Sequence, residues 1–420
     1  MINPRTNSSL MPFQDALQAI QSNNQCLVET EDIPVYKALS RILAEDIIST
    51  INVPPADNSA MDGYALNTAD WRPNQPLKVS QRIPAGTAPQ PLEVNTCARI
   101  FTGAEIPAGA DCVIMQENAI EQANDIEQEN DIEKKSGTEK NSQVVFTQEP
   151  KPQNNIRPQG QDIRQGDVVF HKGQKILPQH IGMLANVGIT DIRVYKKLKV
   201  GILTTGDELI PPGTPLQKGQ IYNSNGPMLC TLIEQWGHKV EAYKHVIDDY
   251  DSTVTALTNM TRVCDFVLSC GGVSVGEEDH IKEVIEKNGT FALWKVAMKP
   301  GKPLLHAKLF NTPFLGLPGN PSSTLVTSHF FAKLALAISA GQKVSAPTGF
   351  PILAGFERNS TLKRDEFLRV NLEGDVATPH SQQSSGALHA ACTCDGYLHI
   401  PANTKIEKGK PFTYFPFYCF

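Results

Sequence analysis

The chain has 420 residues, of which 40% are hydrophobic and 20% charged, and its formal net charge at pH 7 is −6. This length provides for two to four domains, each able to bury a substantial core. A mildly acidic balance argues against a broad nucleic-acid surface, so any basic site must be local.

The nine cysteines contain no C-x-x-C pair, and the closest spacing is Cys392-Thr-Cys394, a poor metal clamp. Cys264 and Cys270 lie in apolar runs, which is typical of buried, reduced thiols. No N-terminal signal pattern and no run of 18 apolar residues occurs. We therefore expect a soluble cytoplasmic protein without a membrane or nucleic-acid partner.

The N-terminal region combines helical patterns with a small β-rich segment. Apolar spacing predicts helices over residues 11–22 and 36–48. Over residues 52–116, proline and glycine punctuate short apolar runs, which indicates a small all-β domain. Its polar clusters, 57–64 and 102–104, are by themselves more typical of turns than of a site.

Residues 121–142 differ in composition from what surrounds them. Asn124-Asp-Ile-Glu127 recurs as Asn130-Asp-Ile-Glu133, in a stretch with almost no apolar content. This composition predicts a solvated insertion between two strands, with no function required of it. A helix is expected over residues 178–187.

Residues 199–340 alternate between strand and helix patterns. Expected strands at 200–204, 239–247 and 264–269 are each followed by a helix, which indicates a parallel sheet covered on both faces. Ligands of such sheets bind beyond the carboxyl ends of the strands. All three strands end in polar clusters, and this coincidence predicts a ligand site: Asp207-Glu208, Asp248-Asp249, and the glycine-rich turn that leads to Asp279.

The glycine-rich turn, residues 270–276, joins a strand to a helix. This arrangement places backbone N–H groups and a helix N-terminus around an anion, although a tight turn explains a lone Gly-Gly equally well. Glu277, Glu278 and Asp279 follow directly. Acids beside a phosphate loop repel its ligand unless a cation bridges them, which suggests a divalent metal.

A second candidate site is cationic. Lys295, Lys299 and Lys302 accompany two prolines and a glycine over residues 295–303, and such a stiff cationic loop suits an oxyanion. The tail, residues 350–420, returns to short β runs and adds Arg364 and Arg369, which are surface residues unless the fold returns them to the cleft. No Ser-His-Asp order or zinc pattern emerges, and His280 is more typical of a structural or solvent-facing residue.

The expected fold is multidomain α/β plus β. A doubly wound, mostly parallel sheet forms the centre, a small all-β domain is inserted in an N-terminal linking region, and a β-barrel or sandwich forms the C-terminus. The expected boundaries are 1–50 with 157–197 for the linking region, 51–156 for the inserted domain, 198–345 for the α/β domain and 346–420 for the C-terminal domain.

Six motifs in this order resemble the molybdopterin molybdenumtransferase (molybdenum insertase) family, to which a domain of the scaffold gephyrin is related. The resemblance extends from about Phe13 to Phe417, and residues 121–142 lie outside it. The motifs are Ser59-Ala-Met-Asp62-Gly-Tyr64, Thr102-Gly-Ala104, Thr205-Gly-Asp-Glu-Leu209, Ser274-Val-Gly276 with Asp279, Lys299-Pro-Gly-Lys302-Pro303 and Leu317-Pro-Gly-Asn-Pro321.

The resemblance implies a Mg²⁺-dependent reaction in which molybdate enters the dithiolene of adenylylated molybdopterin and AMP is released. It also implies a homodimer whose clefts are shared between subunits, with transient contacts to the adenylyltransferase and to molybdoenzymes or their chaperones. Two alternatives stay open: a gephyrin-like binding module that turns nothing over, and the related molybdopterin adenylyltransferase, which lacks the flanking β domains.

Site residues follow from the same resemblance. Catalytic roles are implied for Asp62, Glu208, Asp279, Lys295 and Lys299, and Mg²⁺ ligation for Glu208, Asp248 and Asp279. The residues implied to bind the pterin nucleotide are Thr102, Asp162, Thr205, Gly206, Asp248, Gly271, Gly272, Ser274, Gly276, Pro318 and Pro321. Those implied to bind molybdate are Lys299, Lys302, Pro303, Ser322, Arg369 and Ser385. His389-Ala390-Ala391 departs from the serines that many members carry there.

The composition of the insertion leads to a first prediction. Deleting residues 122–137 should leave the melting temperature and the activity nearly unchanged, because shortening a long surface loop changes the closure free energy by only about 0.6 kcal/mol per factor of two in length. Thermal unfolding of the deleted and full chains measures this. A large drop in melting temperature would show that the segment packs against the rest of the molecule.

Overall fold

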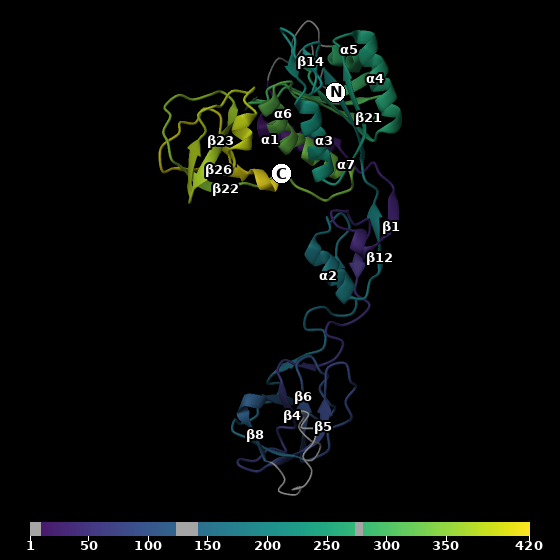
Figure 1. Ribbon diagram of the computed structural model, residues 1–420, viewed down its shortest axis with the longest axis vertical. Coiled ribbons are helices and arrows are strands. Elements are labelled where there is room, and N and C mark those ends of the chain that lie inside the picture. The colour runs from purple at the N-terminus through teal and green to yellow at the C-terminus, as the bar shows by residue number, and fades with distance from the viewer. Residues whose placement is uncertain (1–9, 123–141, 274–279) are drawn as a thin grey trace. The chain divides into compact units, whose positions relative to one another are not determined.

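The computed structural model describes residues 10–122, 142–273 and 280–420. The expectations for Ser274, Gly276 and Asp279, and for the centre of the insertion, lie outside these residues. The chain divides into two compact units (Figure 1). Unit 1 comprises Met1–Glu45, Lys172–Ile181 and Asp191–Phe420, and unit 2 comprises Asp46–His171 and Gly182–Thr190.

Unit 2 is built on a curled six-stranded sheet, which confirms the expected β domain. Its strand order is β7-β4-β6-β5-β9-β8. Side chains alternate between two cores, so that Tyr64 and Leu66 enter one and Ala65 the other. The strands are β4 (Gly63–Leu66), β5 (Leu77–Ile83), β6 (Thr96–Ile100), β7 (Cys112–Met115), β8 (Ala119–Gln122) and β9 (Gln143–Phe146), with a 3₁₀ turn η2 (Gln116–Asn118) before β8.

Two short ladders complete unit 2. β3 (Asn58–Ser59) pairs with β10 (Ile156–Arg157), and β2 (Ile47–Ile48) pairs with β11 (Val168–Phe170). β8 and β9 form an antiparallel pair in which Gln122 lies opposite Gln143. The residues that flank the insertion are therefore strand neighbours, as the sequence predicts.

The linking region corrects one prediction. α1 (Phe13–Asn23) forms as expected, but residues 36–48 do not form a helix. Only a 3₁₀ turn, η1 (Val35–Lys37), occurs, and the Leu43 amide donates to the carbonyl of Gln174 at 3.0 Å. Leu39, which a helix would have to bury, is 53% exposed. Backbone pairing with a segment remote in sequence thus outweighs the local apolar spacing.

The rest of this region is an antiparallel ladder and one helix. β1 (Thr30–Pro34) pairs with β12 (Asp191–Tyr195). α2 (Pro178–Asn186) occupies the range predicted as helical.

A six-stranded mixed sheet forms the centre of unit 1. Its order is β16-β13-β17-β21-β20-β18, in which the first four strands are parallel and the last two antiparallel. The strands are β13 (Lys199–Thr205), β16 (Lys239–Val246), β17 (Phe266–Cys270), β18 (Gly289–Trp294), β20 (Leu305–Leu309) and β21 (Thr312–Leu317). The short pair β14 (Leu209–Ile210) and β15 (Ile221–Tyr222) lies between β13 and α3 in the chain.

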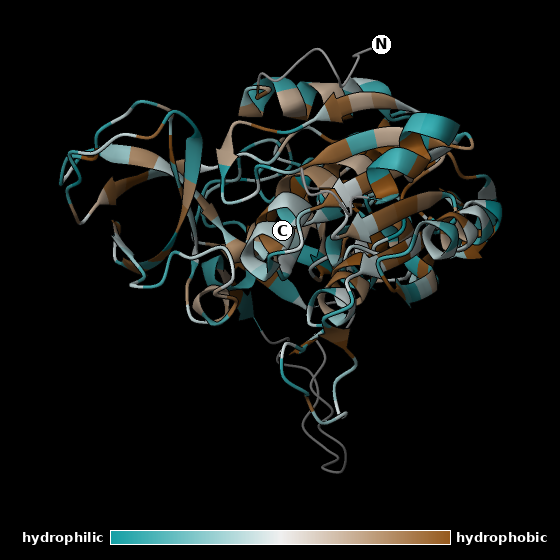
Figure 2. Ribbon diagram, turned by 90° about the horizontal axis from the view of Figure 1, so that it is seen from above, coloured by the Kyte–Doolittle hydropathy of each residue, from teal (hydrophilic) through white to brown (hydrophobic). Residues whose placement is uncertain are grey.

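Helices cover both faces of this sheet. The helices are α3 (Asn225–Gln235), α4 (Tyr250–Val263), α5 (His280–Asn288), α6 (Pro321–Thr327), the π-helical turn η3 (Ser328–Ala332) and α7 (Lys333–Ser339). On β17, Phe266 and Leu268 pack toward α1, α3 and the α6–α7 run, whereas Val267 packs toward α4 and α5. Figure 2 shows the hydrophobic strands between helices that carry alternating hydrophilic and hydrophobic residues. The doubly wound, mostly parallel sheet is confirmed.

Among the described residues, no helix has both the length and the hydropathy that a membrane crossing requires.

The C-terminal strands close into a five-stranded barrel. They are β22 (Phe350–Ala354), β23 (Asp365–Glu373), β24 (Val376–Pro379), β25 (Gly396–Ile400) and β26 (Pro411–Pro416), followed by a 3₁₀ turn η4 (Phe417–Cys419), and a short helix α8 (His389–Cys392) precedes β25. Closure occurs because the long β23 pairs with β25 through its first half and with β24 through its second. β19 (Met298–Lys299) adds to the start of β23 in parallel, so the cationic loop is joined directly to the barrel.

An aromatic cluster connects the barrel to the α/β domain. The Phe330 side chain is 1% exposed, and its ring centroid lies 5.3 Å from Phe13, 4.8 Å from Phe367 and 5.0 Å from Phe415. These rings come from η3, α1 and two barrel strands. The cluster therefore couples three parts of unit 1 in one core.

Phe330→Ala should destabilise the protein by about 3–5 kcal/mol, because the cavity it leaves cannot be filled without moving three elements. Phe310→Ala is the matched control, since Phe310 is 43% exposed and its truncation leaves no cavity. Denaturant unfolding of both variants measures the difference. Equal stability losses would mean that this cluster is not a structural joint.

Candidate functional site

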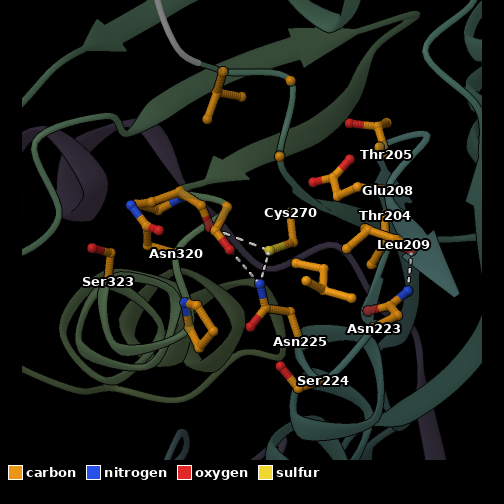
Figure 3. Close-up of a pocket in the computed structure, with 18 of the residues that line it drawn as sticks. Thr204, Thr205, Glu208, Leu209, Asn223, Ser224, Asn225, Cys270, Asn320 and Ser323 are labelled. Atoms are coloured by element: carbon orange, nitrogen blue, oxygen red, sulfur yellow. Dashed lines mark hydrogen bonds between the residues drawn. The ribbon is translucent and has the colours of Figure 1, made fainter. Parts of the chain in front are cut away.

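A pocket of about 670 Å³ opens at the carboxyl ends of the parallel strands (Figure 3). β16, β13 and β17 are neighbours in the sheet, so their three polar ends meet at one edge as predicted. The pocket brings together the following predicted site residues: Thr205, Gly206, Glu208, Asp248, Gly271, Gly272, Pro303, Pro318 and Pro321.

Two glycines of the pocket wall have backbone conformations that residues with a side chain rarely adopt. Gly206 has a φ of +144°, and a Cβ there would lie 2.5 Å from the carboxylate of Glu208. Gly271 has a φ of +90°, and a Cβ would lie 3.0 Å from the carbonyl oxygen of Thr205. Both backbone conformations therefore favour glycine, which lets the chain approach a neighbour closely. The amide of Gly271 itself donates to the carbonyl of Leu317 at 3.2 Å.

Residues that the sequence analysis missed build the floor of the pocket. Asn225 Nδ2 donates to Cys270 Sγ at 3.1 Å and to the carbonyl of Gly319 at 2.6 Å, which ties α3 to the loop after β21 (Figure 3). Asn223 Nδ2 donates to Thr204 Oγ1 at 2.9 Å, and its Oδ1 accepts from the amide of Gly226. The only sequence signal for these residues was Asn223-Ser-Asn225 just before a helix.

Cys270 is a structural thiol. Burial raises its pKa to about 11, so it stays protonated at neutral pH and is a poor nucleophile. Its Sγ lies 3.2 Å from the carbonyl of Pro318, to which the thiol donates. The thiol therefore helps hold the pocket wall.

Carboxylates within the pocket provide hard oxygen donors. Glu208 and Asp248 both line it. No group of three potential metal ligands occurs among residues 10–122, 142–273 and 280–420, and Asp279 is not in these ranges. Two carboxylates suffice for Mg²⁺ when substrate phosphates and waters complete its shell. The donor set therefore fits that ion.

The cationic loop is folded against the barrel and the pocket wall. Pro303 lines the pocket, and the amide of Val296 donates to the carbonyl of Lys302 at 3.0 Å. Lys295 has a φ of +63°, a left-handed conformation that is uncommon for a residue with a side chain. Partial burial, and then the neighbouring Lys302 and Lys282, lower the pKa of Lys295.

Lys299 is held by a carboxylate from the barrel. Its Nζ lies 3.1 Å from Oε1 of Glu366, a side chain on β23 that is 4% exposed. Arg358 forms an ion pair with the other oxygen of Glu366. The sequence analysis did not select Glu366, because nothing in the order of residues indicates that β23 lies beside the cationic loop.

Arg369 and Ser322 are both buried and lie together. One terminal nitrogen of Arg369 donates to Ser322 Oγ and to the carbonyl of Ala387, and the other donates to the carbonyls of Gln382 and Ser384. The Ser322 amide donates to the carbonyl of Ser385 at 2.9 Å. Both terminal nitrogens of Arg369 are therefore engaged with protein atoms. In this arrangement Arg369 holds residues 382–387 over the start of α6, and the pocket wall does not include it.

Unit 2 contains the remaining predicted residues. Asp62 Oδ1 accepts from both the amide and the hydroxyl of Thr102, each at 2.7 Å, and these hydrogen bonds, the backbone one first, lower the Asp62 pKa. The two clusters that resemble turns in sequence thus form one hydrogen-bonded pair with an ionised carboxylate. Asp162 lies elsewhere in unit 2, where its amide donates to the carbonyl of Val53 at 3.0 Å.

Comparison with known proteins covers nearly the whole chain. Residues 11–188 match the MoeA N-terminal region (domains I and II), residues 201–337 the probable molybdopterin-binding domain, and residues 352–417 the MoeA C-terminal region (domain IV). Molybdopterin molybdenumtransferase of Haemophilus influenzae is 39% identical over 354 residues, 83% of each chain. That of Synechococcus elongatus is 34% identical over 89% of this chain and 90% of its own.

A solved structure has the same architecture. The molybdopterin biosynthesis MoeA protein of Pyrococcus horikoshii superposes with a TM-score of 0.74 at 30% identity, covering 97% of this chain and 99% of its own. The resemblance of the six motifs is therefore confirmed over the full fold. The chain belongs to the molybdopterin molybdenumtransferase family.

Proposed function

We propose that this protein completes molybdenum cofactor biosynthesis by inserting molybdate into adenylylated molybdopterin, with Mg²⁺-dependent release of AMP. The family names the class of reaction. The observation that carries the specific reaction is the pocket, whose one wall holds two carboxylates and whose other wall continues into the lysine-bearing loop at Pro303.

Each end of the pocket suits a different part of the substrates. The glycine turns at Gly206 and Gly271 suit a phosphate-bearing ligand, because the absence of side chains lets it approach the backbone closely. Lys299 and Lys302 suit a tetrahedral dianion, which requires converging cations in a partly dry site. The pyrophosphate linkage would then lie at the acidic end, and the dithiolene of the pterin would be directed to the lysines.

Glu208 and Asp248 would hold Mg²⁺, which when bound offsets the negative charge of the pyrophosphate. The protein's own groups do the positioning. The two glycine turns orient the nucleotide, Lys299 and Lys302 orient molybdate, and Ser322 with Ser385 shapes the wall through Arg369. In the proposed reaction the two dithiolene sulfurs bond to molybdenum as molybdate loses an oxygen as water. Water cleaves the pyrophosphate linkage, so that AMP leaves and the pterin keeps its phosphate.

Asp62, Thr102 and Asp162 enter this proposal through a homodimer in the cytoplasm. Each cleft would combine the α/β domain of one subunit with the β domain of the other. The adenylyltransferase would supply the substrate, and molybdoenzymes or their chaperones would receive the product.

The central test is AMP release by the purified protein given Mg²⁺ and adenylylated molybdopterin. Release should require molybdate, and Glu208→Gln should lower its rate about 10- to 100-fold at every molybdate concentration, as expected when a charge-assisted contact is lost. Glu234→Gln, an exposed change on α3, is the control. Binding of the substrate without any AMP release would instead favour a gephyrin-like binding module.

A shared cleft has its own test. In a heterodimer of one Asp62→Asn subunit and one Glu208→Gln subunit, one cleft has both residues intact and the other has neither. Such a heterodimer, purified through two different tags, should therefore recover about half of the wild-type rate, whereas each parent homodimer stays impaired. Failure to recover activity would place Asp62 and Glu208 of the same subunit in one cleft, whereas an Asp62→Asn homodimer with the wild-type rate would place Asp62 outside the site.

A further inference from the structure

Glu366 is a buried carboxylate placed against the cationic loop. Its side chain is 4% exposed, and it comes from β23 of the barrel, whose start pairs in parallel with β19 so that Glu366 lies beside Lys299. The amide of Asp365 donates to the carbonyl of Ala297 at 2.9 Å, and Arg364 donates to the carbonyl of Met298 at 3.3 Å. These bonds hold the carboxylate at a constant position relative to the loop.

The charges around Glu366 leave one positive charge in excess. Oε1 lies 3.1 Å from Lys299 Nζ, and Oε2 is paired with Arg358. Two cations therefore share one carboxylate. The Lys299 side chain is still 43% exposed, so its ammonium can also donate outward, because it carries three N–H groups and Glu366 takes one.

We propose that Glu366 is a resident counter-anion of the oxyanion site, which keeps molybdate weakly enough bound to be passed on to the dithiolene. This inference rests on the proposed function, because it takes Lys299 as a contact of molybdate. While the site is empty, Glu366 satisfies the ammonium. When a dianion arrives, it meets a lysine whose positive potential is partly cancelled at ion-pair distance.

If Glu366 acts as a counter-anion, the change in affinity caused by its substitution depends on the charge of the bound anion. A purely structural role predicts no such dependence. The potential that Glu366 contributes acts on every charge of the bound ion, so a dianion responds about twice as strongly as a monoanion. Molybdate and perrhenate are both tetrahedral oxyanions of metals, with two charges and one charge respectively. The pair therefore separates the effect of charge from the effect of shape.

The experiment is calorimetric titration of the full-length protein with each anion in the absence of pterin. Glu366→Gln keeps an oxygen that can accept from Lys299 but removes the charge. It should tighten perrhenate binding about threefold and molybdate binding about tenfold, so that the logarithm of the second change is about twice that of the first. Glu373→Gln, an exposed change on the same strand, is the matched control and should alter neither affinity.

Arg358→Gln provides a second arm that does not depend on the stability of Glu366→Gln. It removes a positive charge from the same cluster, so both affinities should fall, again about twice as far in logarithm for molybdate. Unchanged affinities in both variants, or equal changes for the two anions, overturn the inference. Absence of molybdate binding by the wild type, or binding that Lys299→Gln leaves unaltered, would count against the proposed function itself.

Discussion

The parallel pairing of β13 with β16 on one side and β17 on the other determines where the rest of the site lies. Parallel strands end at the same edge of a sheet, so the turns after these three strands converge although Thr205, Val246 and Cys270, at which the strands end, are well separated in the chain. The glycines at positions 206 and 271 then allow the turns to approach each other closely. The loop after β21 lies beside these turns, because the side chain of Asn225 donates to both Cys270 Sγ and the carbonyl of Gly319.

The barrel contributes backbone pairing and a charged side chain to the cationic loop of unit 1. Through β19 and β23 it shares backbone pairing with the cationic loop, and through Glu366 it contributes a charge to that loop. Phe330 and its aromatic neighbours hold the same two domains together on the other side. The Lys299 side chain is therefore held by a domain distant in sequence.

Opposite charges are separated along the unit 1 pocket and its extension. Glu208 and Asp248 line the pocket with the glycine turns, whereas Lys299 and Lys302 precede Pro303, the residue of their loop that lines it. Two like-charged groups of substrate would repel each other in a uniform site. In the proposed function, the carboxylates and the lysines would each supply a counter-charge, the first through Mg²⁺ for a pyrophosphate and the second for an oxyanion.

The sequence by itself determined the architecture of the α/β domain, because its strands and helices have clear periodicity and their polar ends follow from chain order. It also determined that the segment 52–116 is β-rich, because proline and glycine punctuate its short apolar runs. Only the tertiary structure decided that residues 36–48 are not helical. Their amides pair with a segment remote in sequence, and no local pattern of residues indicates where that segment lies. It alone decided that Glu366 holds Lys299 and that Arg369 holds residues 382–387, because both contacts depend on where β23 lies relative to two loops. Residue type and spacing carry information about elements, whereas the partner of a buried charge is set by which elements pack together.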